Sequence, residues 1–170
     1  MALPVFVLPV IISTDTASTS ISNVEMVEKA NDVRAVKIDA YFAKNKLPLT
    51  GYGYAFVETA DKYDLDWRLL PAIAMRESTG GRNACYNDIH NVFGWASCKK
   101  VFDSYEHSID SVGAHLSGNI KSTAGYYKGR DIPGKLKRYN SVIPSYTGDI
   151  YSIMSKIENV KIAGGEIAMK

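Results

Sequence analysis

The stretch LLPAIAMRESTGG, residues 69–81, decides the fold that we predict for this chain. Four of its side chains are spaced three or four positions apart and therefore share one face of a helix: Leu70, Ile73, Ala74 and Glu77. We expect this helix to start with Asp66 as its N-cap and to end near Glu77, before Thr79-Gly80-Gly81. Pro71 lacks a backbone N–H group and predicts a local kink.

Glu77 occupies a position at which the apolar stripe predicts an aliphatic residue. A carboxyl group held against an apolar face loses hydration, which raises its pKa. Such a carboxylic acid keeps its proton near neutral pH and can donate it to a leaving glycosidic oxygen. The alternative is that Glu77 merely ends the helix and turns into water.

The rest of the chain predicts a mainly α protein with one irregular or β lobe. Helices are expected over 24–44 and 54–63, from Asp103 with Glu106 as a capping box, from Asp131, and from about Pro144. Residues 82–102 lack a helical period and are expected to form loops with a short hairpin, inserted after the helix that ends at Glu77. Residues 117–128 are expected to form a loop, and residues 161–170 a tail. We therefore expect these helices and the lobe to form a single domain over residues 24–160.

The first 23 residues differ in composition from the rest. Residues 2–12 are almost wholly apolar and residues 13–22 are rich in Ser and Thr. The apolar run is too short to span a bilayer, and Pro4 and Pro9 interrupt it. Its length suits the core of a secretory signal, although no Lys or Arg precedes it, so the alternative is a tail that packs on the domain. We expect an exported protein.

Cys85 and Cys98 flank the irregular segment. In an exported protein two such cysteines predict a disulfide. The alternative is a metal site that also uses His90, but the spacing lacks the close cysteine pair of zinc ribbons and fingers.

Charge and composition restrict the expected partners. A net charge of +2 and scattered short Lys/Arg pairs do not form the concentrated basic face of a nucleic-acid-binding domain. Eleven tyrosines against five phenylalanines suit a polar, sugar-binding groove as well as an ordinary half-buried surface. The sequence contains no Gly-rich phosphate loop and no zinc-peptidase spacing of histidines, so no cofactor is expected. We expect a monomer.

Three segments together resemble the lysozyme-like superfamily of peptidoglycan-cleaving enzymes, and in particular soluble lytic transglycosylases and autolysin-type bacterial N-acetylglucosaminidases. They are the stretch over 69–81, NVFGW at 91–95, and YN at 139–140 with PSYTGDI at 144–150. The resemblance covers about residues 54–158. It implies a lysozyme-like helical domain that cleaves glycan strands of peptidoglycan.

The resemblance also implies roles for individual residues. Glu77 would be the general acid, and Tyr139 or Tyr146 would place a hydroxyl near the reacting sugar, with Tyr139 slightly favoured. The remaining matched residues would bind substrate along the cleft: Ser78, Asn91, Phe93 and Gly94. Each also has an ordinary structural explanation, such as a helix-end hydroxyl for Ser78, core packing for Phe93 and a turn for Gly94.

A second carboxylate is not evident. Glycosidases with two carboxylates place them roughly 5–10 Å apart, and the candidates here are Asp88, Asp103 and Glu106. Lytic transglycosylases use one Glu, because a hydroxyl of the substrate attacks and leaves an anhydro sugar. Hydrolysis and transglycosylation therefore both stay open, as does a non-catalytic glycan-binding or structural cell-surface module of the same fold.

Overall fold

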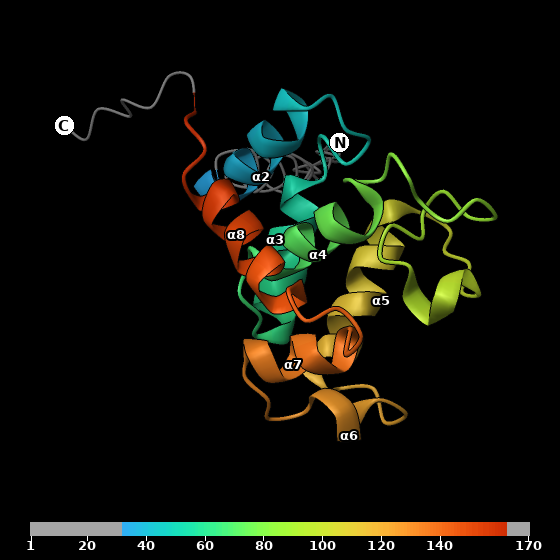
Figure 1. The fold of residues 1–170 in the computed structure, drawn as a ribbon. Helices are drawn as coiled ribbons and strands as arrows, with labels where there is room; N and C mark the ends of the chain where they lie inside the picture. Colours follow the sequence, from blue (N-terminus) through green and yellow to red (C-terminus); the bar gives the residue numbers. More distant parts are fainter. Residues whose placement is uncertain (1–31, 163–170) are drawn as a thin grey trace, which may run out of the picture.

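The computed structural model of the protein describes residues 32–162. This part of the chain is all-α and contains no strand (Figure 1). Its helices are α2 (Val33–Lys44), α3 (Gly53–Tyr63), α4 (Leu69–Ser78), α5 (Tyr105–Ser117), α6 (Ala124–Tyr127), α7 (Ile132–Tyr139) and α8 (Tyr146–Glu158), with a short 3-10 helix η1 (Trp95–Cys98) between α4 and α5. The predicted mainly α class is confirmed, whereas no β lobe is seen in residues 32–162.

Helix α4 lies in the middle of the fold (Figure 1). It packs against α8 and α3, while α3 also packs against α2 and α5. Residues Leu69 to Ala74 are all buried, and Ile73 has no exposed surface. Burial of these apolar residues stabilises the fold and fixes the position of the C-terminal end of α4, where Glu77 lies.

The start of α4 differs from the prediction at two residues. The helix begins at Leu69, so Pro71 lies in its first turn, where an N–H group has no partner within the helix, and no kink is required. Arg68, not Asp66, occupies the N-cap position. The Asp66 carboxylate instead accepts hydrogen bonds from the backbone N–H and the guanidinium group of Arg68.

The predicted cap of α5 is also wrong by one residue. Ser104, not Asp103, is the N-cap, and its Oγ accepts from the backbone N–H of His107 at 3.1 Å. Asp103 is exposed, and its carboxylate lies 3.1 Å from the His107 ring instead. The error has a local cause, because adjacent Asp and Ser are both good N-caps.

The remaining boundaries agree in part with the expectations. Asp131 caps α7 by accepting from the backbone N–H of Gly134, as predicted. Helix α6 interrupts the predicted loop over 117–128, and α8 begins at Tyr146 rather than near residue 144. Residues 24–31 of the first predicted helix, the signal-like segment 1–23 and most of the tail lie outside the described residues.

Candidate active site

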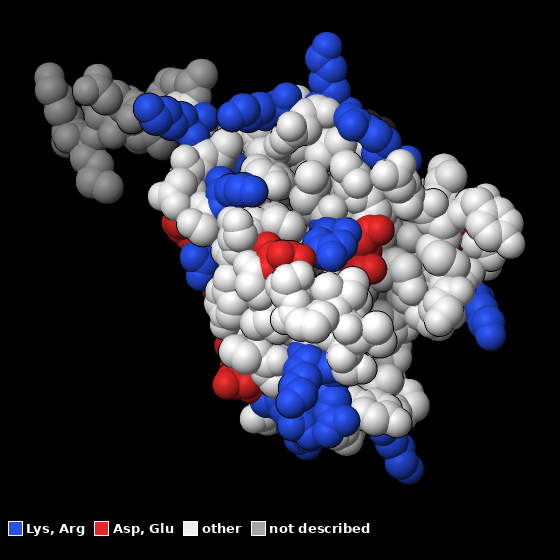
Figure 2. Space-filling view, in the orientation of Figure 1, with Lys and Arg blue, Asp and Glu red and all other residues white. Residues whose placement is uncertain are grey.

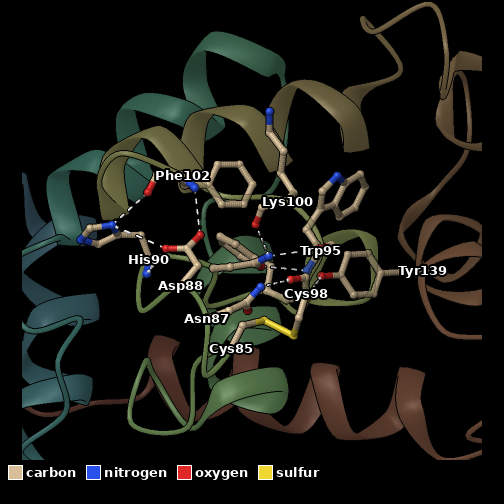
Figure 3. Close-up of a disulfide and its surroundings, with 11 residues drawn as sticks. Cys85, Asn87, Asp88, His90, Trp95, Cys98, Lys100, Phe102 and Tyr139 are labelled. Carbon is tan, nitrogen blue, oxygen red and sulfur yellow. Dashed lines mark hydrogen bonds and ion pairs between the residues drawn. A yellow bond between two sulfur atoms is a disulfide. The ribbon is translucent and has the colours of Figure 1, made fainter.

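The lobe between α4 and α5 projects to one side of the helices (Figure 1) and is held by side chains instead of strands. Asp88 is buried and accepts hydrogen bonds from the backbone N–H groups of His90, at 3.0 Å, and Phe102, at 2.8 Å (Figure 3). Its carboxylate thus joins the two ends of the lobe. Charge-assisted bonds of this kind are about twice as strong as neutral ones.

Asn91 supports the other side of the lobe. Its side chain is fully buried, donates to the carbonyls of Trp95 and Lys100, and accepts from the Trp95 N–H at 2.9 Å. Three bonds from one amide replace the backbone ladder that a hairpin would have formed. Asn91 was expected to line the cleft, but the structure places it behind the wall, in a supporting position.

A disulfide joins Cys85 and Cys98, thirteen positions apart (Figure 3). The pairing agrees with the sequence prediction and excludes the alternative metal site, because neither sulfur is available as a thiolate. Next to it, Ala96, Ser97 and Cys98 all have positive φ, at 54°, 54° and 62°. This conformation is unfavourable for residues with a Cβ atom, so the lobe is strained where it is cross-linked.

A cleft of about 530 Å³ runs between the lobe and α6 and α7. Its lining contains Glu77 from the end of α4, residues from 93–97 of the lobe, and side chains of α6, α7 and their flanks. The full lining is Glu77, Phe93, Gly94, Trp95, Ala96, Ser97, Thr123, Tyr126, Tyr127, Arg138, Tyr139 and Asn140. The structure therefore brings together four of the predicted site residues: Glu77, Phe93, Gly94 and Tyr139.

Glu77 is half-buried, and its carboxylate is held by Tyr146. The Tyr146 hydroxyl donates to Oε1 at 2.6 Å. The neighbouring arginines have other partners, because Arg76 pairs with Asp149 at 3.2 Å and Arg82 donates to the carbonyl of Asn45. Among the described residues Glu77 thus makes no ion pair, and its carboxylate remains available to a ligand in the cleft.

Tyr139 and Tyr146 form a stacked pair beneath the cleft, with ring centroids 6.1 Å apart. Burial raises the pKa of both hydroxyls, and the Glu77 carboxylate raises the pKa of Tyr146 further. Both groups therefore stay protonated and act as donors. Tyr139 donates to the carbonyl of Phe93 at 2.6 Å, so the hydroxyl that reaches Glu77 belongs to Tyr146, the tyrosine that the sequence interpretation ranked second.

Ser78 and Gly94 have clear local roles. The Ser78 hydroxyl is buried, donates to the carbonyl of Ala74 and accepts from the N–H of Gly81, so it closes the end of α4 and lies outside the cleft lining. Gly94 has φ of +60°, and a Cβ atom there would lie 3.7 Å from Oε2 of Glu77. Glycine therefore permits the turn that brings the wall close to the carboxylate.

Trp95, Tyr126, Arg138 and Asn140 line the cleft but were not predicted as site residues. Trp95 stacks on His115, with ring centroids 4.9 Å apart, and lies 5.8 Å from the Tyr139 ring. Burial lowers the pKa of His115. Trp95 follows Phe93-Gly94 directly in the chain, which was a signal for it. Arg138 and Asn140 flank the predicted site residue Tyr139, which was a similar signal, whereas Tyr126 comes from a segment that reaches the cleft only through tertiary packing.

None of the three candidates for a second carboxylate lines the cleft. Asp88 is buried and binds backbone N–H groups of the lobe, and Asp103 faces solvent beside His107. Glu106 lies with Lys62 and Asp110 in a different surface depression. Over residues 32–162, Glu77 is the one acidic side chain in the cleft lining.

Comparison of the chain with known protein families, curated proteins and solved structures gave no match. In residues 32–162 no helix has the length and apolar character needed to cross a membrane. The disulfide points to an oxidising, extracytoplasmic location.

Proposed function

We propose that this protein is a lysozyme-like enzyme that cleaves glycosidic bonds in the glycan strands of peptidoglycan, with Glu77 as its general acid. One observation carries the proposal: the Glu77 carboxyl group lies in an open cleft at the end of a buried helix, bound by a tyrosine hydroxyl and by no basic side chain of the described residues. The resemblance of the three sequence segments supplies the substrate class.

The surroundings of Glu77 suit proton donation. Helix α4 is buried over most of its length, and Tyr146 is almost fully buried, so the backbone of Glu77 and the hydroxyl that holds its carboxyl group both have fixed positions. Fixed geometry is what general acid catalysis requires, because the proton must reach the leaving oxygen over a hydrogen-bond distance. Trp95 and Tyr126 in the lining offer ring surface for sugar packing.

The single acid in the cleft lining favours the transglycosylase route over hydrolysis. Glu77 donates its proton to the glycosidic oxygen as the bond from that oxygen to the anomeric carbon breaks. The Glu77 carboxylate then accepts a proton from a hydroxyl of the same sugar, whose oxygen bonds to the anomeric carbon. The products are an anhydro sugar and a shortened strand, Glu77 is protonated again, and no water is consumed.

A non-catalytic glycan-binding module would leave the carboxyl group sealed or neutralised by Arg76 or Arg82. Both arginines bind elsewhere, which favours an enzyme. A cell-wall substrate also requires the protein to act outside the cytoplasm. We therefore propose an exported enzyme of the cell wall or periplasm, in keeping with its disulfide.

Digestion of purified peptidoglycan followed by mass analysis tests this proposal. We expect products that end in anhydro sugars, each lighter by one water molecule than the product of hydrolysis at the same bond. Products with reducing ends would show hydrolysis and a second catalytic group. Unchanged strands after digestion with folded protein would refute the enzymatic proposal.

The Tyr146→Phe variant is expected to cleave glycan strands roughly 10- to 150-fold more slowly, because a hydrogen bond to a charged group contributes roughly 1.5–3 kcal/mol. The phenylalanine ring preserves stacking on Tyr139, so folding should be retained. Tyr151→Phe is the control, since Tyr151 lies further along α8, is exposed and does not line the cleft. Equal rates for the two variants would show that the Tyr146 hydroxyl does not position Glu77.

A further inference from the structure

Arg138 lies in the last turn of α7, is exposed, and lines the cleft that contains Glu77. Figure 2 shows a cluster of Lys and Arg atoms over the region of α7. Exposed basic residues there are Lys128, Arg130, Lys137 and Arg138. Of these four, only Arg138 belongs to the cleft lining, so it supplies positive charge inside the proposed substrate site.

Arg138 differs from most described arginines because its guanidinium group has no partner among residues 32–162. Within residues 32–162, Arg34, Arg68 and Arg76 form ion pairs, and Arg82 donates to a backbone carbonyl. Arg130 is also without a side-chain partner, but it lies in a separate depression beside Lys62 and Lys135. A guanidinium group carries five donors and stays charged, so Arg138 keeps its full binding capacity for a ligand.

Arg138 is the one basic side chain of residues 32–162 in the cleft lining, and three neutral donors near it already have partners. The hydroxyls of Tyr139 and Tyr146 donate to Phe93 and Glu77, and the Asn91 amide supports the lobe. The one carboxylate in the lining, Glu77, accepts from Tyr146 instead of from Arg138. A negatively charged ligand group would therefore find its best partner at Arg138, because the planar fork of arginine binds a carboxylate through two parallel hydrogen bonds.

We propose that Arg138 binds a carboxylate of the glycan substrate and makes the cleft select anionic strands over neutral ones. The inference rests on the proposed function. Two groups of peptidoglycan have this chemistry: the lactyl carboxylate of N-acetylmuramic acid, which is free where the stem peptide has been removed, and the carboxylates of the stem peptide itself.

The inference is tested by calorimetric titration of the full chain with oligosaccharide probes. The chain carries Glu77→Gln, so that the probes bind but are not cleaved. Three oligosaccharides of equal length serve as probes: neutral N-acetylglucosamine, the alternating N-acetylmuramic acid polymer without peptides, and the same polymer with stem peptides. Adding Arg138→Gln should weaken binding of an anionic probe about 10-fold and leave binding of the neutral probe unchanged. Arg138→Lys should fall between, because lysine keeps the charge and loses the fork.

Arg130→Gln is the matched control, as an exposed arginine without a side-chain partner outside the cleft. If Arg138→Gln weakens binding of the peptide-bearing probe alone, the stem peptide supplies the carboxylate. If it weakens binding of the peptide-free polymer, the lactyl group supplies it. Three results would overturn the role of Arg138 while the proposed function stands: Arg138→Gln weakens binding of the neutral probe equally, Arg130→Gln weakens binding of the anionic probes equally, or Arg138→Gln leaves every affinity unchanged. Failure of all three probes to bind the Glu77→Gln protein, with no cleavage by the wild type, would overturn both.

Discussion

The Glu77→Gln variant is expected to cleave peptidoglycan strands about 10²–10⁴-fold more slowly than the wild type, the usual contribution of general acid catalysis. Glutamine keeps the shape of the side chain and an oxygen that can accept from Tyr146, but it has no proton to give to the leaving oxygen. Substrate binding should largely survive. The free energy of unfolding should stay the same or rise slightly, because a partly buried carboxyl group is removed.

Three further acid variants make this result interpretable. Glu106→Gln and Asp103→Asn change exposed residues outside the cleft lining and should leave the rate almost unchanged. Asp88→Asn should lower stability, because one amide oxygen cannot replace both carboxylate oxygens that accept from His90 and Phe102. A rate loss in Glu106→Gln or Asp103→Asn as deep as that of Glu77→Gln would reveal a second catalytic carboxylate. Near-normal cleavage by Glu77→Gln would refute its assignment.

Replacing Cys85 and Cys98 together with alanine is expected to lower the free energy of unfolding by about 3 kcal/mol, the chain-entropy contribution of a loop of this length. The free energy would be measured by denaturant unfolding. Activity should fall as well, because the cross-link holds the strained residues 96–98, two of which line the cleft. The loosened loop would no longer present a fixed wall opposite Glu77.

The reduced wild type is the matched control for the double variant, and the two should unfold at the same denaturant concentration. Titration of the unreduced wild type should find no reactive thiol, in agreement with the pairing of both cysteines. Two titratable thiols in the native protein, or an unfolding free energy unaffected by the double substitution, would contradict a stabilising disulfide.

Local patterns were sufficient to predict most of the helical fold. The apolar spacing over 69–77 predicted the buried face of α4, and Asp131 predicted the start of α7, because both signals depend on neighbours within one or two turns. Ser104 shows the limit of such signals. Two adjacent residues with similar capping ability cannot be distinguished without knowing where the chain enters the helix.

The lobe and the cleft could be predicted only in part, because long-range contacts decide them. Asp88 and Asn91 bind backbone groups up to fourteen residues away, and these bonds take the place of the expected hairpin. Tyr146 lies 69 residues from Glu77 in the chain, and no periodicity relates them. Arg138 likewise appears in the sequence as one of several basic residues, and only the packing of α7 places it beside the cleft.

The dependence of α4 on α8 has a consequence for biosynthesis. Tyr146, the first residue of α8, holds Glu77, and Ile150, Met154 and Ile157 are buried core residues of that same helix. In a nascent chain that is still emerging from the ribosome or a translocation channel, Glu77 therefore lacks its bond to the Tyr146 hydroxyl, and α4 is not yet packed against α8. We expect such a chain to be inert toward glycan, so that cleavage by the proposed enzyme starts only after α8 has been released.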